Sequence, residues 1–246
     1  MTGSAGKIRI GTSGWHYRHW KGPFYPEDLP AGEWLDFYRK RFSTAEINNS
    51  FYRMPEEKTL REWKKTVPEG FVFALKASRY ITHMKKLKDP RKPLAGFLER
   101  AEELGGRLGP VLFQLPPRWR CNPERLEAFL KLLPKDGRFT FEFRDPSWFN
   151  DDIYRLLEKA GAAFCIYQLA GRISPKEVTA DFVYVRLHGP RGEAYRGSYS
   201  DRDLAGWAGA FSSWSGMGKD VYCYFDNDDS GYAPRNALRL SEMLKK

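Results

Sequence analysis

The sequence predicts a single α/β domain with the (β/α)8 TIM-barrel fold, built on eight parallel strands. The first observation is size: 246 residues, 41% of them hydrophobic, are enough for one large core, and TIM barrels commonly have this length. The second is that eight short apolar runs recur along the chain, as expected of parallel strands covered on both faces. The third is that amphipathic segments separate these runs. We therefore treat residues 1–246 as one domain, with residues 1–7 as a flexible N-terminal segment.

The predicted strands are residues 8–13, 44–48, 71–76, 110–115, 139–143, 163–167, 181–187 and 220–225. The predicted helices are residues 32–42, 56–67, 93–104, 124–133, 153–160, 204–211 and 234–244. Three have clear N-cap residues, Asn122, Asn150 and Ser200, whose side chains satisfy free N–H groups of a first helical turn. Between the sixth and seventh strands only residues 174–178 resemble a helix, so we expect a shortened sixth helix.

Composition limits the compartment and the partners. No apolar run approaches the roughly 18 residues of a membrane helix, so we expect a cytoplasmic protein without a membrane partner. The cysteines, Cys121, Cys165 and Cys223, are odd in number and widely spaced, which favours reduced structural thiols. The formal net charge of +10 favours phosphate-bearing partners.

The first loop, GTSGWHYRHWKGPFYP at residues 11–26, is unusually rich in aromatic side chains. In a TIM barrel the loop after each strand lies at the C-terminal end, where the active sites of these barrels are found. We expect Trp15 or Tyr17 to keep one ring face open for stacking, with Trp20 and Phe24 buried as supports. The alternative is that these rings only seal the barrel end.

Polar residues interrupt the apolar segments at the C-terminal ends of most predicted strands. They are Glu46, Asn48, Lys76, Gln114, Glu142, Arg144, Arg186, His188, Asp226 and Asn227. Because these strand ends meet at one small opening, we expect the side chains to form one site. Ion pairs with no catalytic role are the alternative.

Several long motifs resemble, in order and spacing, the YecE-like family, a domain of unknown function (DUF72). They are GTSGWHYRHWKGPFYP, EINNSFYRMP, FALKASRYITHMKKLKD, LGPVLFQLPPRW, FEFRDPSWF, DFVYVRLHGP, YRGSYSD and GYAPRNALRL. The resemblance implies a TIM barrel of unestablished activity. Two segments depart from the family pattern: Tyr167-Gln168-Leu169 stands where the family has alanine, aspartate and serine, and Asp226-Asn227-Asp228 where it has two asparagines and an aspartate.

Residues 77–93, here called the basic loop, indicate what binds. Its charged residues are Arg79, Lys85, Lys86, Lys88, Arg91 and Lys92, with Asp89 as the single acid. Such cations beside exposed rings, which we expect at Tyr80, Trp119, Tyr195 and Tyr199, are typical of proteins that bind single-stranded nucleic acid. Residues 188–199 have the glycine and arginine content of a phosphate-binding loop. The predicted ligand-binding residues are Trp15, Tyr17, Asn48, Tyr52, Arg79, Gln114, Arg144, Arg186, Tyr195, Tyr199 and Asn227.

The predicted catalytic residues are Glu46, Lys76, Glu142 and His188. In a phosphodiesterase, Glu142 or Glu46 would be the general base and His188 or Lys76 the general acid. Two alternatives stay open: a glycosidase that uses Glu46 and Glu142 as paired carboxylates, and a nucleic-acid-binding module without turnover. No cofactor fingerprint is present, and a single divalent ion on Glu46, Glu142, His188 or Asp226 is compatible with the sequence.

Overall fold

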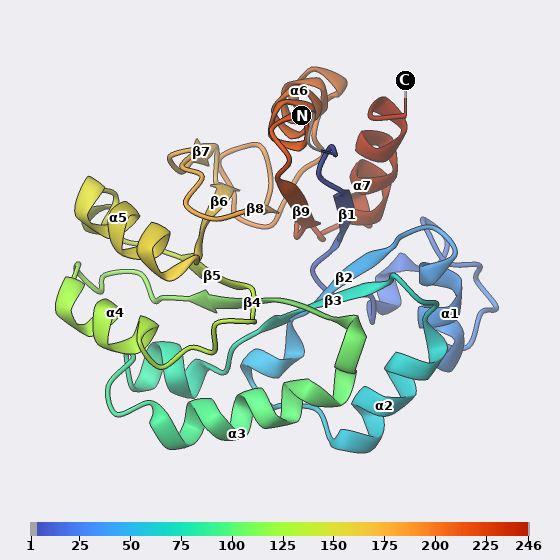
Figure 1. The fold of residues 1–246 in the computed structure, drawn as a ribbon. Helices are drawn as coiled ribbons and strands as arrows, with labels where there is room; N and C mark the ends of the chain where they lie inside the picture. The colour runs from blue at the N-terminus through green and yellow to red at the C-terminus, as the bar shows by residue number, and fades with distance from the viewer. Residues whose placement is uncertain (1–3, 246) are drawn as a thin grey trace.

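The computed structural model describes residues 4–245 and contains eight parallel strands in a barrel, which confirms the predicted fold class (Figure 1). Around the barrel the strands follow the order β1-β9-β8-β6-β5-β4-β3-β2. Their bounds are Ile8–Thr12 (β1), Thr44–Ile47 (β2), Val72–Lys76 (β3), Leu108–Gln114 (β4), Phe139–Glu142 (β5), Ala163–Leu169 (β6), Phe182–Leu187 (β8) and Asp220–Phe225 (β9). A two-residue strand, Arg172–Ile173 (β7), pairs with β6 outside this path.

Helices lie around the outside of the strands (Figure 1). Their bounds are Trp34–Arg39 (α1), Glu57–Thr66 (α2), Arg91–Ala101 (α3), Pro123–Leu130 (α4), Asp151–Ala160 (α5), Asp201–Gly216 (α6) and Tyr232–Met243 (α7). The three predicted caps are confirmed: Asn122 and Asn150 accept from backbone N–H groups of α4 and α5, and Ser200 forms a capping box with Asp203 at α6. Short 3-10 turns and one π-helical turn, Tyr80–Met84 (η4), lie in the connections.

The barrel closes between β1 and β2 through one side chain as well as the backbone. An isolated bridge joins Ser13 to Glu46. Below it, the Tyr38 hydroxyl accepts from the Thr12 N–H at 2.9 Å and donates to the Thr44 carbonyl at 3.0 Å. A Cβ at Gly11 would lie 2.2 Å from the Thr44 carbonyl oxygen, so glycine is required for this close approach of the strands.

The connection between β6 and β8 differs from the prediction. Residues 174–178 form no helix. Instead, Ala170 and Gly171 both have positive φ, as in a two-residue hairpin turn, and return the chain to β7. The following segment lies along β6, where the Ser174 and Thr179 hydroxyls accept from backbone N–H groups of that strand. These two hydroxyl groups therefore hydrogen-bond to β6 from the segment predicted to form a helix and from the residue that follows it.

The termini and cysteines complete the description. Within the predicted flexible segment, residues 1–3 lie outside the described residues, while the N–H groups of Gly6 and Lys7 donate to the Ser215 carbonyl at 2.9 Å and to Asp220 at 2.8 Å. All three cysteines are free, as predicted, and two of them are buried in strands. Between residues 4 and 245, no helix is long and apolar enough to cross a membrane.

Alternation along the strands determines what fills the barrel. Successive side chains of a strand point to opposite faces, so every second residue points inward. Tyr184 and Tyr224 form an inner aromatic layer, with ring centroids 5.2 Å apart. Two residues further along β8, the same alternation places Arg186 inside the barrel at its C-terminal end. Charged residues therefore lie directly above a tyrosine layer.

Candidate functional site

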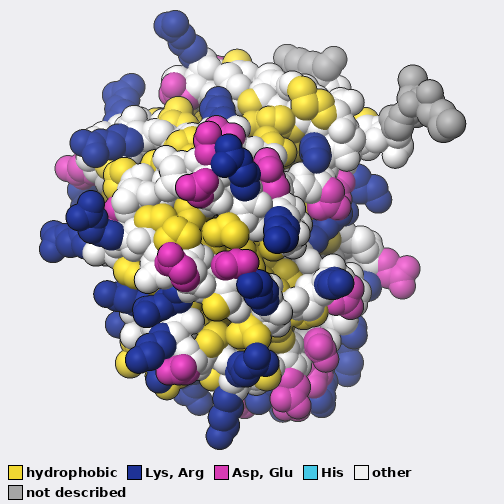
Figure 2. All heavy atoms as spheres, turned by 60° about the vertical axis from the view of Figure 1, so that its left-hand side comes forward, with side chains coloured by type: hydrophobic (Ala, Val, Ile, Leu, Met, Phe, Trp, Pro, Cys, Tyr) yellow, Lys and Arg dark blue, Asp and Glu magenta, His cyan; other side chains and the backbone are white. Residues whose placement is uncertain are grey.

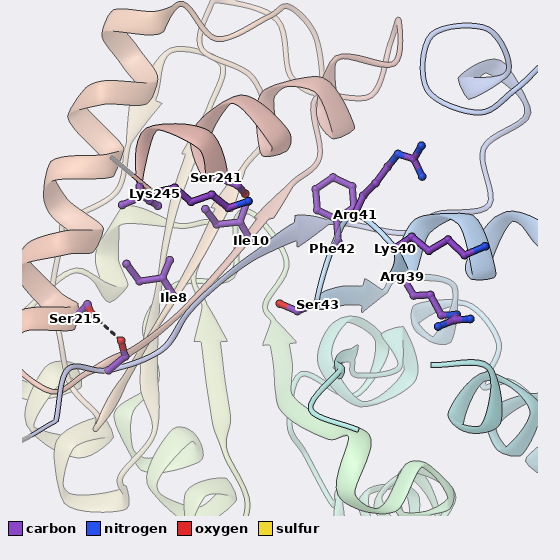
Figure 3. A pocket seen from close by; sticks show the side chains of 12 residues that line it. Ile8, Ile10, Arg39, Lys40, Arg41, Phe42, Ser43, Ser215, Ser241 and Lys245 are labelled. Atoms are coloured by element: carbon purple, nitrogen blue, oxygen red, sulfur yellow. Dashed lines mark hydrogen bonds between the residues drawn. The ribbon is translucent and has the colours of Figure 1, made fainter. Parts of the chain in front are cut away.

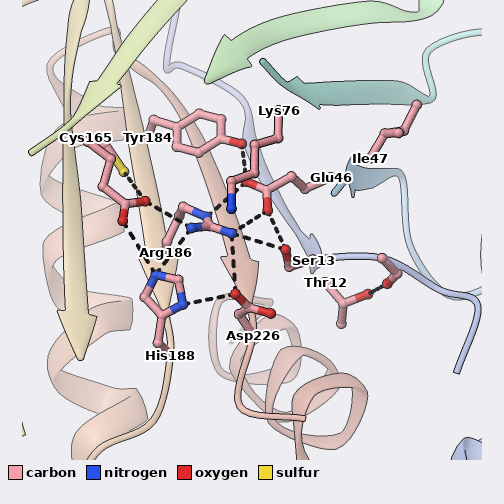
Figure 4. A network of polar contacts seen from close by, with 12 residues as sticks. Thr12, Ser13, Glu46, Ile47, Lys76, Cys165, Tyr184, Arg186, His188 and Asp226 are labelled. Carbon is pink, nitrogen blue, oxygen red and sulfur yellow. Dashed lines mark hydrogen bonds and ion pairs between the residues drawn. The ribbon is translucent and has the colours of Figure 1, made fainter. Parts of the chain in front are cut away.

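Six charged or titratable side chains meet inside the C-terminal end of the barrel, and we call them the charged network; Figure 4 labels four of them, Glu46, Arg186, His188 and Asp226. They are Glu46, Glu142, Arg144, Arg186, His188 and Asp226. They come from the ends of β2, β5, β8 and β9, which confirms that polar strand ends converge at one opening. They also make direct hydrogen bonds with one another, so much of their charge is neutralised internally.

Arg186 is the centre of the charged network and is 1% exposed. Its guanidinium donates to both oxygens of Glu46, at 2.7 and 3.0 Å, and to Glu142 Oε2 at 2.9 Å. A third carboxylate, that of Asp226, lies 3.3 Å away. Burial alone would lower the pKa of Arg186, but these carboxylates raise it well above its ordinary value. The guanidinium is thus permanently charged and held in one orientation.

Glu142 is enclosed by positive charge. It accepts from Arg186 and from the Arg144 Nε, and its side chain is fully buried. Burial favours a raised pKa, but Arg144, Arg186 and further cations outweigh it and hold the pKa of Glu142 well below its usual range. A carboxylate so strongly stabilised in its ionised form is a weak base. The predicted role of Glu142 as a general base therefore has little support in this geometry.

His188 is a neutral imidazole that lies between the carboxylate of Asp226 and the guanidinium of Arg144. Its Nδ1 lies 2.9 Å from Asp226 Oδ2, and its Nε2 lies 3.0 Å from an Arg144 nitrogen. Because a guanidinium only donates, we assign Nε2 as the acceptor and place the proton on Nδ1. Burial, followed by Arg186 and Arg144, lowers the pKa of His188 well below its usual value. The expected role of His188 as a general acid is not supported, because it carries no extra proton near neutral pH.

Beside the charged network lies an open hollow of about 480 Å³, here called the mouth cleft. It is lined by Tyr17, Asn48, Tyr52, Lys76, Ala194, Tyr195, Arg196, Asp226, Asp228 and Asp229. Lys76 is the one predicted catalytic residue that borders it, since Glu46, Glu142 and His188 are each 0% exposed. Burial and the charge of Arg186 lower the pKa of Lys76 to about 8.

Two aspartates of the mouth cleft were not among the predicted catalytic residues. Burial raises the pKa of Asp226 and raises that of Asp228 to about 6. Asp228 accepts from the Trp20 indole N–H, and His19 lies 3.1 Å from its carboxylate. The sequence signal was the departure Asp226-Asn227-Asp228, which places an additional acid at this strand end.

The first loop is more deeply buried than expected. Trp15 is 1% exposed, so of the two rings expected to keep an open face, Trp15 or Tyr17, the first is excluded. It packs edge-on against Trp63, with ring centroids 4.9 Å apart. Tyr17 instead borders the mouth cleft, and its hydroxyl donates to the Ser13 carbonyl at 2.6 Å. Trp20 is buried as predicted, whereas Phe24 is only partly buried.

Other predicted ligand contacts are structural. Tyr199 is 4% exposed, and its hydroxyl accepts from the Gly189 N–H at 3.1 Å. Asn227 is fully buried and donates to Asn236 and to the Gly197 carbonyl. Trp119, which we expected to be exposed, packs edge-on against Trp148. The expectation that these three side chains contact the ligand is wrong, because a ligand in the mouth cleft would not reach side chains that are covered in this way.

Of the other predicted ligand contacts, most lie at or beside the mouth cleft and one does not. Tyr52 and Tyr195 line the mouth cleft and are 73% and 46% exposed. Asn48 also lines it, and Arg79 lies beside Tyr52, with its guanidinium carbon 5.9 Å from the ring centroid. Gln114 is partly buried at the end of β4 and is not part of the lining.

The proposed single-ion site is not assembled in this conformation. Among residues 4–245, no three His, Cys, Asp or Glu side chains are grouped so that they could hold a metal. Glu46 and Glu142 are instead bonded to guanidinium groups.

Comparison with known proteins agrees with this architecture. The UPF0759 protein YunF of Bacillus subtilis is 25% identical over 275 residues, covering 96% of this chain and 94% of that protein. A crystal structure of a DUF72 family protein from Thermotoga maritima is 28% identical, with a TM-score of 0.89 over 98% of this chain and 100% of the other. One from Enterococcus faecalis is 20% identical, with a TM-score of 0.83 over 97% and 96%.

More distant similarity concerns the fold. D-Psicose 3-epimerase from Clostridium cellulolyticum is 13% identical, with a TM-score of 0.56 over 96% of this chain and 98% of the other, which is a likeness of fold alone. The family described as "Protein of unknown function DUF72" matches residues 9–246. With almost the whole chain matched, this protein belongs to the DUF72 family.

Proposed function

We propose that the C-terminal end of the barrel binds a phosphate-bearing ligand, and that this ligand is single-stranded nucleic acid. The observation that carries the proposal is the pairing of exposed tyrosine rings with cations of the basic loop. The Arg79 guanidinium lies 5.9 Å from the Tyr52 ring centroid, and the Lys85 ammonium lies 5.8 Å from that of Tyr80. Rings that stack on bases beside cations that contact phosphates are the usual elements of such a site.

The rings are concentrated at one end of the molecule. Tyr52, Tyr80 and Tyr195 are 73%, 43% and 46% exposed and follow β2, β3 and β8. Met84, the last residue of η4, and Ile173, in β7, are also exposed at this end, whereas Met217, which follows α6, is exposed at the other end. Exposed apolar side chains gathered on one face favour a binding surface over incidental exposure.

The cations of the basic loop are not neutralised by the protein. Among residues 4–245, no ion pair is formed by Arg79, Lys85, Lys86, Lys88, Arg91 or Lys92. By contrast, Arg61, Arg155 and Arg239 on the helices each contact carboxylates. Arg91 and Lys92 also lie in the first turn of α3, whose dipole adds positive potential. This excess of positive charge favours an anionic ligand.

Net charge alone would not identify this surface. On the face drawn in Figure 2, Lys and Arg side chains are spread widely, with Asp and Glu side chains between them. What distinguishes the basic loop is that two of its cations, Arg79 and Lys85, form no ion pair within residues 4–245 and lie beside the exposed rings of Tyr52 and Tyr80. We therefore place the phosphates that are not cleaved along the basic loop, because Asp226, Asp228 and Asp229 would repel them, and only the scissile phosphodiester beside Lys76 in the mouth cleft.

Phosphodiester hydrolysis, the second part of the proposal, needs acids and bases that reach the ligand. Lys76, Asp226 and Asp228 border the mouth cleft, whereas Glu46 and Glu142 are covered. With a pKa of about 8, Lys76 is a proton donor near neutral pH, and Asp228, with a pKa of about 6, is a base. Lys76 thus keeps the general-acid role that the sequence suggested for it or His188, and we assign Asp228 the base role suggested for Glu142 or Glu46.

Fluorescence anisotropy with a labelled single-stranded oligonucleotide tests the binding. Charge reversal at Lys85, Lys86 and Lys88 should weaken binding and reduce the salt slope by about 2, since each lost contact with a single strand removes about 0.7. Charge reversal at Lys131, Lys135 and Lys159, exposed lysines near α4 and α5, is the matched control. Equal loss in both triple variants, or preferential binding of a neutral oligosaccharide, would contradict the proposal.

A further inference from the structure

Lys76 is a cation at the mouth cleft that the charged network does not use. It is the last residue of β3, and its side chain points into the barrel end (Figure 4). Within residues 4–245, no hydrogen bond or ion pair involves its amino group. Its Nζ lies 4.4 Å from the centroid of the Phe51 ring. A structural lysine inside a barrel would normally be paired with a carboxylate.

The neighbouring carboxylates are already bonded to other groups. Glu46 accepts from Arg186, Ser13 and Tyr184, and Glu142 accepts from Arg186 and Arg144. Structural pairing therefore does not explain why a lysine occupies position 76.

The surroundings keep part of the Lys76 amine neutral. Burial, and then the positive charge of Arg186, lowers its pKa to about 8, so that near pH 7 the nucleophilic neutral form is about two hundred times more abundant than in an ordinary lysine. Asp226 and Asp228 border the same cleft and have raised pKa values, which suits them to deliver and accept protons. A neutral amine beside proton carriers, in a cleft open to ligands, is the arrangement used for covalent catalysis at carbonyl carbons.

We propose that Lys76 forms an imine with the aldehyde or ketone carbon of a phosphate-bearing ligand in the mouth cleft. This inference rests on the proposed function, because the basic loop would hold the phosphate. It names a substrate class that the proposed hydrolysis does not require, namely a carbonyl compound.

The chemistry balances without an added oxidant or reductant. The neutral Lys76 amine attacks the carbonyl carbon, a C–N bond forms as the C=O π bond breaks, and one proton passes from the nitrogen to the oxygen by way of a cleft carboxylate to give a neutral carbinolamine. The C–O bond then breaks, and the oxygen leaves as water with a proton delivered from Asp226 or Asp228. The resulting iminium withdraws electrons from the adjacent carbon, so a C–H bond there can lose its proton to a carboxylate of the cleft.

Trapping with sodium cyanoborohydride tests the proposal, because this reagent reduces an iminium to a stable secondary amine. The full-length protein is incubated with two probes, glyceraldehyde 3-phosphate and a single-stranded oligonucleotide that carries one abasic aldehyde site. Intact mass and peptide mapping should then locate one adduct per chain on Lys76. The probe that gives the adduct distinguishes a free sugar phosphate from an aldehyde within nucleic acid.

Two variants complete the test. Lys76→Arg keeps the charge but removes the nucleophile and should reduce the adduct at least about tenfold, whereas Lys135→Arg, at an exposed position, should leave it unchanged. Adducts spread over exposed lysines of the folded wild-type protein would overturn the proposal without reference to any variant. Failure of both probes while the intact oligonucleotide still binds would overturn imine formation alone. An adduct with the sugar phosphate but no oligonucleotide binding would overturn the nucleic-acid proposal alone.

Discussion

At the scale of single residues, Arg186 has the largest predicted effect on stability. It is 1% exposed and contacts three carboxylates. In Arg186→Met these carboxylates would remain buried without their shared cation, so we expect a loss of about 3–5 kcal/mol in the free energy of unfolding. The loss should shrink as the pH falls from 7 to 5, because the unpaired carboxylates can then bind protons. Urea denaturation at several pH values measures both effects.

Arg155→Met is the matched control. Arg155 also contacts two aspartates, at 3.3 and 3.9 Å, but its side chain is 70% exposed on α5. Exposed pairs contribute at most about 1 kcal/mol, so this variant should be nearly as stable as the wild type. Similar losses in the two variants would show that burial of Arg186 is not what makes its ion pairs important.

His188 makes stability depend on pH. Burial and two neighbouring guanidinium groups lower its pKa in the folded protein. Below about pH 6.5 the unfolded chain binds a proton at His188 that the folded chain does not. This residue therefore lowers the free energy of unfolding by about 1.4 kcal/mol for each unit by which the pH falls. His188→Gln lacks this contribution. The difference in unfolding free energy between wild type and variant should therefore fall by about that amount from pH 6 to 5, and a constant difference would contradict the assignment of a neutral His188.

The sequence predicted where the charged network lies but not the protonation states of its side chains. Strand alternation and the common C-terminal end suffice to bring Glu46, Glu142 and Arg186 together. The weak basicity of Glu142 and the neutral state of His188 depend on which side chains lie across the barrel. Likewise, Tyr199 is buried against Phe225, a contact between distant segments that no local pattern indicates.

At the scale of elements, the closure between β1 and β2 depends on the Tyr38 hydroxyl, which links the two strands. Tyr38→Phe would leave a buried N–H and a buried carbonyl without this partner, so we expect a loss of about 1–3 kcal/mol. Tyr154→Phe is the control, since no hydrogen bond of its hydroxyl is found within residues 4–245. Equal thermal unfolding of both variants would show that this link adds little to closure.

Most elements could be predicted because local signals agree with the fold. The caps at Asn122, Asn150 and Ser200 lie where each helix begins. The connection after β6 could not, because residues 174–178 combine a proline with polar residues whose contacts are tertiary. The Ser174 and Thr179 hydroxyls bond to β6, and this pairing across the chain replaced the expected helix.

At the scale of the whole molecule, backbone strain is confined to one end. In the described residues, positive φ at non-glycine positions occurs at Lys86, Leu87, Asp89, Arg118, Ala170 and Tyr195. All six lie in loops that follow strands, on the side of the mouth cleft. Strained backbone concentrates at functional sites, so this distribution favours the C-terminal end as the working surface. The amino-acid identities alone do not indicate which residues adopt a positive φ.

A basic groove at the other end of the barrel is the alternative binding site for an anionic ligand. It encloses about 530 Å³ and is lined by Arg39, Lys40, Arg41 and Lys245 among other residues (Figure 3). Its cations are largely engaged, because Arg39 and Lys40 pair with Asp36, and the Arg41 guanidinium lies 3.5 Å from the Phe37 ring centroid. An anion would have to displace these contacts, whereas the cations of the basic loop are free of ion pairs within residues 4–245.

Hydrogen exchange with and without a saturating single-stranded oligonucleotide distinguishes the two ends. A ligand slows exchange where it covers or orders the backbone. We expect slower exchange in residues 49–55, 77–93 and 189–199, which carry the exposed rings and the basic loop, and no change in residues 39–43 and 241–245. Raising the salt concentration should remove this protection, because phosphate contacts release counterions on binding. Protection confined to the groove of Figure 3 would instead place the ligand at the N-terminal end and contradict the proposed binding surface.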